Sequence, residues 1–269
     1  MAIDPIMPPL PRDYAGVNWL GFWTLYMKEV RRFAKIPMQT VLAPVMSSLL
    51  YILVFAVATK GARPPVHGVQ FTEFVAPGLV MMTVLNNAFA NTSSSLLQAK
   101  MMGLSADFLT PPLTSIEQTT AFILGGATRG IVVGLVTIAT VWPFAHAHLA
   151  HAWAALWFMF GASMIMSELG VLAGLWADKF DHMAMVQNFV IMPLTFLSGT
   201  FYTADALPEP FRTISHWNPM FYMIDGFRYG FIGVADGNVA IGATMTLGLT
   251  VALFVWCWVL FVKGYRLKT

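Results

Sequence analysis

Long apolar segments alternate with short polar ones along almost the whole chain. Each approaches or exceeds the about 20 residues that a helix needs to cross a hydrocarbon core of about 30 Å. The pattern therefore predicts an all-α polytopic membrane protein with six transmembrane helices. The six segments are 38–59, 71–98, 116–143, 152–176, 183–201 and 240–262.

A different pattern precedes the first apolar segment. Within residues 14–36, large apolar side chains recur every three or four positions and basic side chains share the other side. The apolar set is Trp19, Phe22, Trp23, Tyr26, Val30 and Phe33, and the basic set is Lys28, Arg31, Arg32 and Lys35. Such a helix suits the lipid headgroup plane, and an ordinary cytosolic helix is the alternative. We expect residues 1–37 to form a cytoplasmic tail and an amphipathic interfacial helix, and residues 38–269 a six-span domain.

Lysine and arginine are unevenly distributed between the loops. Most lie before the first span, in the second and fourth loops, and after the last span. Cytoplasmic loops are the ones enriched in these residues. Both termini are therefore expected in the cytoplasm, and the segment between the fifth and sixth spans is expected outside.

That outer segment, residues 194–233, is neither a span nor an ordinary loop. It starts as a membrane helix, breaks at Ser198-Gly199 and crosses a polar stretch. From Asn218-Pro219 it becomes apolar and aromatic again, with two charges at Asp225 and Arg228. Its last part is too short to cross the bilayer, and irregular backbone is tolerated there only where protein or water satisfies it. We predict an external re-entrant helical hairpin between helices 5 and 6, in which Asp225 and Arg228 share a helix face.

Composition agrees with a membrane protein and excludes other classes. The chain is 57% hydrophobic and 10% charged, whereas soluble domains carry about 25% charged residues. A net charge of +2 does not suggest a nucleic-acid partner. His146, His148 and His151 supply metal-ligand types in one short loop, but we expect no metal site there.

The order of motifs in the outer segment resembles that of a known family. The motifs are S-G-x-F-Y from Ser198, L-P at Leu207, and N-P-M-x-Y-x-I-D-G-F-R-Y-G-F-I-G from Asn218 to Gly233. This order is similar to that of the membrane subunits of type-2 ABC exporters in bacteria. The resemblance implies a permease in the bacterial inner membrane that pairs with a second copy and with two ABC ATPase subunits. Its substrate would be a lipid, a glycan or a drug-like molecule.

No G-x-x-x-x-G-K-[ST] motif occurs in the chain. ATP and Mg²⁺ would therefore be bound by the partner ATPase, and this subunit would carry no cofactor and no catalytic residue. The loop between spans 2 and 3 resembles the family's coupling helix, with Leu104, Ser105, Asp107, Phe108 and Leu109 as the contacts. Ser105 is a plausible N-cap, and Phe108 and Leu109 would need a partner if they faced the cytosol. A plain connecting loop is the alternative.

Two ionisable residues lie inside predicted spans. Arg129 in span 3 and Glu168 in span 4 are at similar depth, and an isolated charge there costs several kcal/mol. We therefore predict an ion pair between them, either as a gate or as a structural link. A proton-coupled secondary transporter, using these two residues and Glu73, is the alternative function, and a membrane-embedded transferase is a weaker third.

Polar side chains on two spans are candidates for a substrate path. Asn87 and Asn91 lie one turn apart on span 2, and Asn188 and Thr195 lie on span 5. In the family, spans 1, 2 and 5 wall the conduit. Helix packing explains the same residues equally well.

Overall fold

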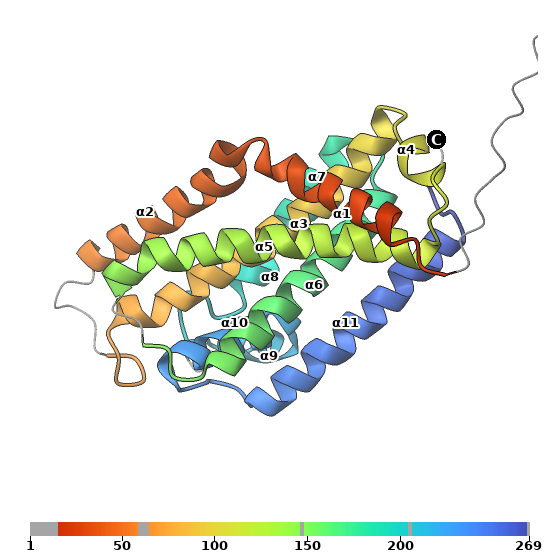
Figure 1. Cartoon of the computed structure of the whole chain (residues 1–269). Coiled ribbons are helices and arrows are strands. Elements are labelled where there is room, and N and C mark those ends of the chain that lie inside the picture. Colours follow the sequence, from red (N-terminus) through yellow and green to blue (C-terminus); the bar gives the residue numbers. More distant parts are fainter. Residues whose placement is uncertain (1–15, 59–64, 146–147, 204–205, 268–269) are drawn as a thin grey trace, which may run out of the picture.

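A computed structural model of the chain describes residues 16–58, 65–145, 148–203 and 206–267 (Figure 1). Regular structure in these ranges is helical, apart from one isolated bridge between Val66 and Val69. The predicted N-terminal tail, up to residue 15, lies outside the described residues, and so does His146. The elements are α1 (Trp19–Ala34), η1 (Met38–Leu42), α2 (Ala43–Ala58), α3 (Phe71–Met101), α4 (Ala106–Leu109), α5 (Ser115–Ala145), α6 (Ala152–Trp176), α7 (Phe180–Val186), η2 (Gln187–Ile191), α8 (Met192–Phe196), α9 (Phe211–Trp217), α10 (Pro219–Ile232) and α11 (Val239–Val262).

Five helices in the described ranges are long and apolar enough to cross a membrane: Met38–Val57, Phe71–Met101, Ser115–Ala145, Ala152–Trp176 and Val239–Val262. They correspond to the predicted spans 1, 2, 3, 4 and 6. The predicted fifth span is instead built from α7, η2 and α8, in which η2 is a π-helical turn. It ends at Phe196, before the left-handed Gly199 with φ of 74°.

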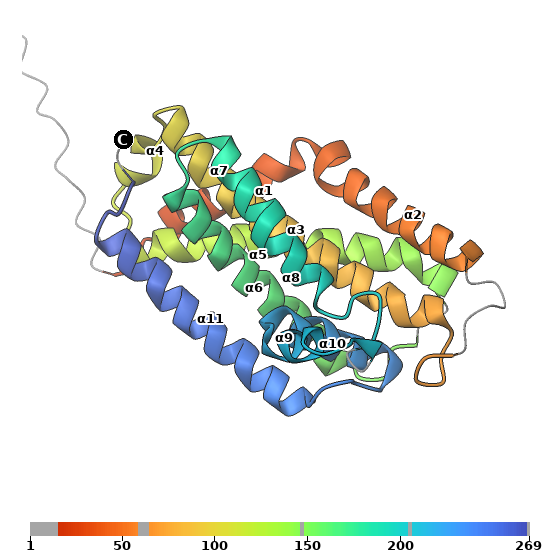
Figure 2. The same ribbon diagram turned by 180° about the vertical axis from the view of Figure 1, so that it is seen from behind.

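The centre of the bundle is α3, which packs between α5 and α6. Its apolar side chains Phe74, Met81, Val84 and Leu85 are completely buried. The peripheral helices α2 and α11 instead expose apolar side chains such as Leu50, Val54 and Val255, as lipid-facing or partner-facing helices do. Figures 1 and 2 show α2 and α11 on opposite sides of the central helices.

Small residues allow α3 and α6 to pack closely. A Cβ added to Gly170 of α6 would overlap Thr92 Oγ1 and stand 2.5 Å from the carbonyl oxygen of Phe89, both on α3. The obstacle includes backbone, which cannot swing aside as a flexible side chain can. Close approach of this kind is how membrane helices associate when lipid is as apolar as their own side chains.

This contact gives a direct test of the packing. Gly170→Ala is expected to destabilise the protein by about 1–3 kcal/mol, the usual range for overpacking. Gly248→Ala on α11, where an added Cβ meets nothing within 4 Å, is the matched control and should be neutral or stabilising by up to about 1 kcal/mol. Thermal unfolding in mild detergent measures both; equal melting temperatures for the two variants would contradict the close contact.

Helix α1 does not stand apart from the bundle. The backbone N–H of Asn18 donates to Glu117 Oε1 over 2.6 Å at the start of α5, and Glu29 packs on Gly125 further along the same helix. The two helices therefore run side by side in the same direction. Figure 1 places the start of α1, α4 and the end of α11 at one end of the bundle, away from α9 and α10.

Candidate functional site

The short helices α9 and α10 lie within residues 194–233, the segment for which an external hairpin is predicted. Asn218 ends α9 and begins α10: its Oδ1 accepts from the N–H of Met220 over 3.0 Å, and Pro219 occupies the first helical position. The Asn218 amide also donates to the carbonyl of Leu194 in α8 over 2.6 Å. One side chain thus caps α10 and ties it to the preceding membrane segment.

Arg228 of α10 lies at the centre of this region and is 1% exposed. Its Nη2 donates to the carbonyl of Gly199 over 2.6 Å and its Nε to that of Phe74 over 3.2 Å. The guanidinium carbon also lies 4.0 Å from the centroid of the Phe74 ring. This one cation joins α10, the turn after α8 and the start of α3.

Asp225 provides the balancing charge one turn earlier on α10. Its Oδ1 lies 3.8 Å from Arg228 Nη1, and its two oxygens accept the backbone N–H groups of Asp236 and Gly237 over 2.9 and 2.8 Å. The carboxylate therefore fixes the loop that leads into α11. The pair is buried and partnered, as charged groups inside a protein must be.

The loop after α3 contains the residues that resemble a coupling helix. Helix α4 forms there, and Ser105 precedes it but makes no capping hydrogen bond. The expectation that Phe108 faces the cytosol is wrong: Phe108 is 2% exposed and its ring packs at 5.2 Å on Phe122 of α5. Leu104 and Asp107 are exposed, as are the preceding Met101 and Met102.

A groove of about 400 Å³ separates this loop from α1. Lys28 of α1 lies 5.8 Å above the Phe108 ring. The two elements thus form one surface at one end of the bundle; its residues are Asn18, Leu20, Gly21, Thr24, Leu25, Lys28, Asp107, Phe108, Pro111, Pro112 and Leu113.

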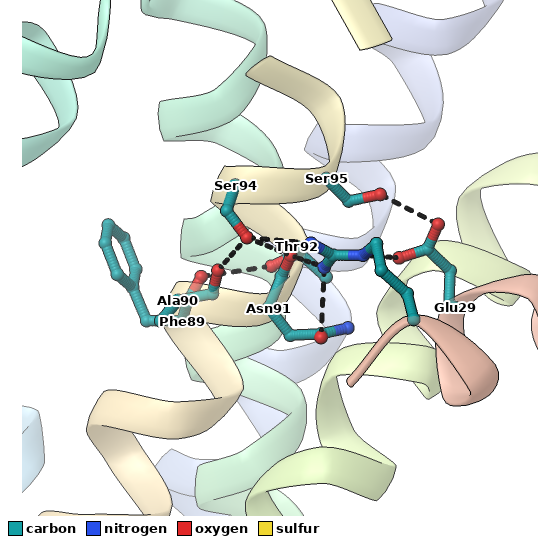
Figure 3. Close-up of polar contacts among 8 residues, drawn as sticks. Glu29, Phe89, Ala90, Asn91, Thr92, Ser94 and Ser95 are labelled. Carbon is teal, nitrogen blue, oxygen red and sulfur yellow. Dashed lines mark hydrogen bonds and ion pairs between the residues drawn. The ribbon is translucent and has the colours of Figure 1, made fainter. Parts of the chain in front are cut away.

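A polar network joins α1 to α3 and was not foreseen from the sequence. Figure 3 shows Glu29 of α1 reaching Ser95 of α3, with an oxygen–oxygen distance of 2.8 Å. Arg32 Nε lies 3.5 Å from Glu29 Oε2, and Arg32 Nη2 donates to the backbone and side-chain oxygens of Asn91 over 2.5 and 3.0 Å. The sequence does contain a signal for this network. Glu29 lies four residues from both Leu25 and Phe33, so it places a carboxylate on the buried face of α1.

Comparison with known proteins is consistent with this architecture. Residues 21–232 match the family described as ABC-2 type transporter. The inner membrane transport permease YadH of Escherichia coli strain K12 is 34% identical over 253 residues, which cover 93% of this chain and 98% of that protein. The chain belongs to the ABC-2 type transporter family. It is therefore a multi-pass inner-membrane transport permease, and membership implies an ABC ATPase as its partner.

More distant members are similar to this ABC-2 permease along most of its length. Nodulation protein J of Rhizobium leguminosarum bv. viciae is 24% identical over 234 residues, 84% of this chain and 86% of that protein. Nodulation protein J of Neorhizobium galegae is 22% identical over 251 residues, 89% and 91% of the two chains.

The predicted ion pair between Arg129 and Glu168 is not formed in this permease. Arg129 faces α3, where its Nη2 donates to Asn87 Oδ1 over 3.0 Å. Glu168 is completely buried, neither of its carboxylate oxygens has a hydrogen-bond partner within the described ranges, and its backbone carbonyl faces Cys257 of α11. The two residues lie on consecutive long helices, but Arg129 bonds to α3 and the backbone carbonyl of Glu168 faces α11, so that the predicted pair does not form.

The four candidate path residues do not line one cavity within a single chain. Asn87 and Asn91 are buried against Arg129 and Arg32, and buried Thr195 donates to the carbonyl of Ile191. Asn188 is exposed on η2. The amide that does bridge α3 to η2 is Gln187, which donates to Asn86 Oδ1 over 2.6 Å.

His151, the last histidine before α6, packs against the outer segment. The ring of His151 stacks on Tyr229 at 4.5 Å. Among the residues that the structure describes, no group of three His, Cys, Asp or Glu side chains is placed to hold a metal ion.

Proposed function

We propose that this permease is the membrane half of an ATP-driven exporter, in which two copies and two ABC ATPase subunits form one complex. The observation that carries the proposal is the surface formed by α1 and the loop around α4. The groove between the two elements has a volume of about 400 Å³, and the residues just before α4 include the exposed Met101, Met102 and Leu104. Contiguous exposed apolar side chains beside polar groups are typical of a protein-docking site.

The proposed orientation places this surface and both termini in the cytoplasm. The start of α1, α4 and the end of α11 share one end of the bundle (Figure 1). Basic residues near that end, Lys100 in the last turn of α3 and Lys263 directly after α11, agree with the positive-inside rule for a cytoplasmic side. ATP and Mg²⁺ would be bound there by the ATPase, not by this chain.

At the opposite end, we propose that α9 and α10 form a re-entrant hairpin between the composite fifth span and the sixth span, α11. Helix α10 has 14 residues, about 21 Å at 1.5 Å per residue, which is too short for a core of about 30 Å. It is nevertheless buried, including Phe221, Ile224 and Phe227. The segment from Phe180 to Phe196 is about 25 Å long and spans most of that core.

The path for substrate is proposed to lie between two copies. The exposed faces of α2 and of the α7–α8 segment, which includes the amide of Asn188, are the surfaces that a second copy would cover. π-helical turns, which often mark functional sites, occur in both, at Met38–Leu42 and Gln187–Ile191. The cargo class we propose is a lipid, a glycan or a drug-like molecule.

Reconstitution tests this function. The permease and its ATPase partner, purified together and placed in vesicles, are expected to move cargo only when ATP is hydrolysed. In the Asn188→Cys variant, oxidation should cross-link residue 188 of one copy to residue 188 of the second copy and yield a covalent dimer. Full transport by the permease alone, driven by a pH gradient, would overturn the proposal and favour a proton-coupled transporter.

A further inference from the structure

The network between α1, α3 and α5 carries more positive charge than it neutralises. Glu29 lies opposite Arg32, with 3.5 Å between Oε2 and Nε. Arg129 of α5 adds a second guanidinium, which bonds Asn87 one helical turn from the Asn91 that Arg32 bonds. The hydrogen-bond partner that the structure gives Arg129 is the neutral amide oxygen of Asn87, 3.0 Å away. Within the described ranges, no carboxylate lies within ion-pair distance of the Arg129 guanidinium.

The same cluster contains N–H donors that nothing in the described chain accepts. Arg129 Nε and Asn91 Nδ2 are both buried without a hydrogen-bond partner, and Asn91 as a whole is 0% exposed. Asn87 and Asn91 are one turn apart on α3, and each bonds one of the two arginines. Unpaired buried donors are unfavourable, and so is a surplus cation at membrane depth. An anion is the ligand that would satisfy both.

A basic groove on the surface borders the cluster at Arg32. This groove has a volume of about 580 Å³ and is lined by Thr24, Lys28, Arg31, Arg32, Lys35 and Ile36. Arg32 belongs both to the groove and to the buried network, and its side chain is 26% exposed. Guanidinium groups match the oxygens of phosphate in geometry and charge better than an ammonium group does.

The groove adjoins an apolar surface that a free anion would not need. Ile36, Met38 and Leu42, at the turn from α1 into the first span, are 50%, 72% and 47% exposed. A molecule with a phosphate head and an acyl chain would cover both surfaces at once. Basic clusters beside a membrane helix are where anionic headgroups collect.

We propose that Arg32 and Arg129 form a binding site for the phosphate of an anionic lipid headgroup, which enters along the basic face of α1. The acyl chain lies over Ile36 and Met38. The site belongs to the permease itself, so its existence does not depend on the ATPase or on the direction of transport.

The test uses purified permease in neutral detergent, with dioctanoyl phosphatidic acid as the probe. The probe is expected to raise the melting temperature in a saturable way. Dioctanoyl phosphatidylcholine and inorganic phosphate at the same concentrations are expected to leave it unchanged. An equal effect of the neutral lipid would show that apolar contact alone is responsible, and an equal effect of inorganic phosphate would show a free-anion site; either result overturns the proposal.

Variants locate the site. Arg129→Gln keeps an amide beside Asn87 but removes the charge, and should weaken binding of phosphatidic acid about 10- to 100-fold, as loss of one charge-assisted contact does. Arg31→Gln, in the same groove but outside the network, is the matched control and should weaken it less than about fivefold. Equal losses in both variants would mean non-specific attraction and would overturn the proposal.

Stability without lipid separates ligand binding from a structural role. Because Arg129 is a cation without a counter-charge, Arg129→Gln should melt at or above the wild-type temperature when no lipid is present. A melting temperature several degrees lower would make Arg129 a structural residue and would contradict the site. If Arg129→Gln gives no folded protein, Arg129→Lys decides: it should fold and bind the probe more weakly than wild type, and unchanged binding would overturn the assignment.

Discussion

The Arg228→Leu variant is expected to lose about 3–5 kcal/mol of folding free energy, the usual result of removing one partner of a buried ion pair. Arg228 is 1% exposed, and the facing Asp225 is 2% exposed. The substitution leaves that carboxylate buried without its cation. It also removes the donors to Gly199 and Phe74, so that two carbonyl groups lose their side-chain partner.

The consequence should spread beyond α10. Gly78 of α3 lies so close to the turn after α8 that an added Cβ would stand 2.6 Å from the carbonyl oxygen of Thr200. Arg228 holds the neighbouring Gly199 in that turn. Loss of the Arg228 hydrogen bond to Gly199 should therefore destabilise the turn after α8. The end of the composite fifth span and the proposed external hairpin should both become less stable as a result.

Thermal unfolding in mild detergent and the yield of folded protein measure this effect. Lys263→Leu, at an exposed position after α11, is the control and should change stability by less than about 0.5 kcal/mol. Adding Asp225→Asn to Arg228→Leu should recover part of the loss, because the buried charge is then gone while an oxygen still accepts from the loop at Asp236. An Arg228→Leu protein that melts like the wild type would refute the role of the pair.

Much of the fold is predictable because the membrane imposes a simple rule on each segment. An apolar stretch long enough to cross the bilayer becomes a helix, and five of the six predicted spans appear as single long helices. The composite helix from Phe180 to Phe196 departs from this picture at Gln187, where a π-helical turn begins. That turn aims the Gln187 amide at Asn86, a tertiary contact that hydrophobicity does not encode.

The polar contacts were harder to predict because they depend on the rotation of each helix about its axis. Arg129 and Glu168 lie inside consecutive predicted spans, yet Arg129 turns to Asn87 of α3, and the backbone carbonyl of Glu168 faces Cys257 of α11. Phe108 follows a polar loop and was expected at the surface, but α4 folds it onto Phe122. Asp225 and Arg228, in contrast, are three residues apart on one helix, so that local spacing sufficed to place them together.

The corrected position of Phe108 changes which residue should test coupling to the ATPase. A charge at Phe108 would disrupt the packing between α4 and α5, and lost activity would then report misfolding. Leu104 and Met102 are instead 45% and 66% exposed on the same loop. If the loop docks on the ATPase, one of these side chains enters the interface without supporting the fold.

Leu104→Asp is therefore expected to weaken association with the ATPase about 30-fold or more, as loss of a buried anchor worth about 2 kcal/mol does. Permease-stimulated ATP hydrolysis should fall with it, while the melting temperature of the permease alone stays unchanged. Leu149→Asp is the matched control, because Leu149 is 51% exposed in the loop before α6, at the opposite end of the bundle. Co-purification and hydrolysis rates distinguish the two variants. If Leu104→Asp assembles and stimulates hydrolysis as the wild type does, the loop around α4 is a plain connection, and the ATPase must dock elsewhere.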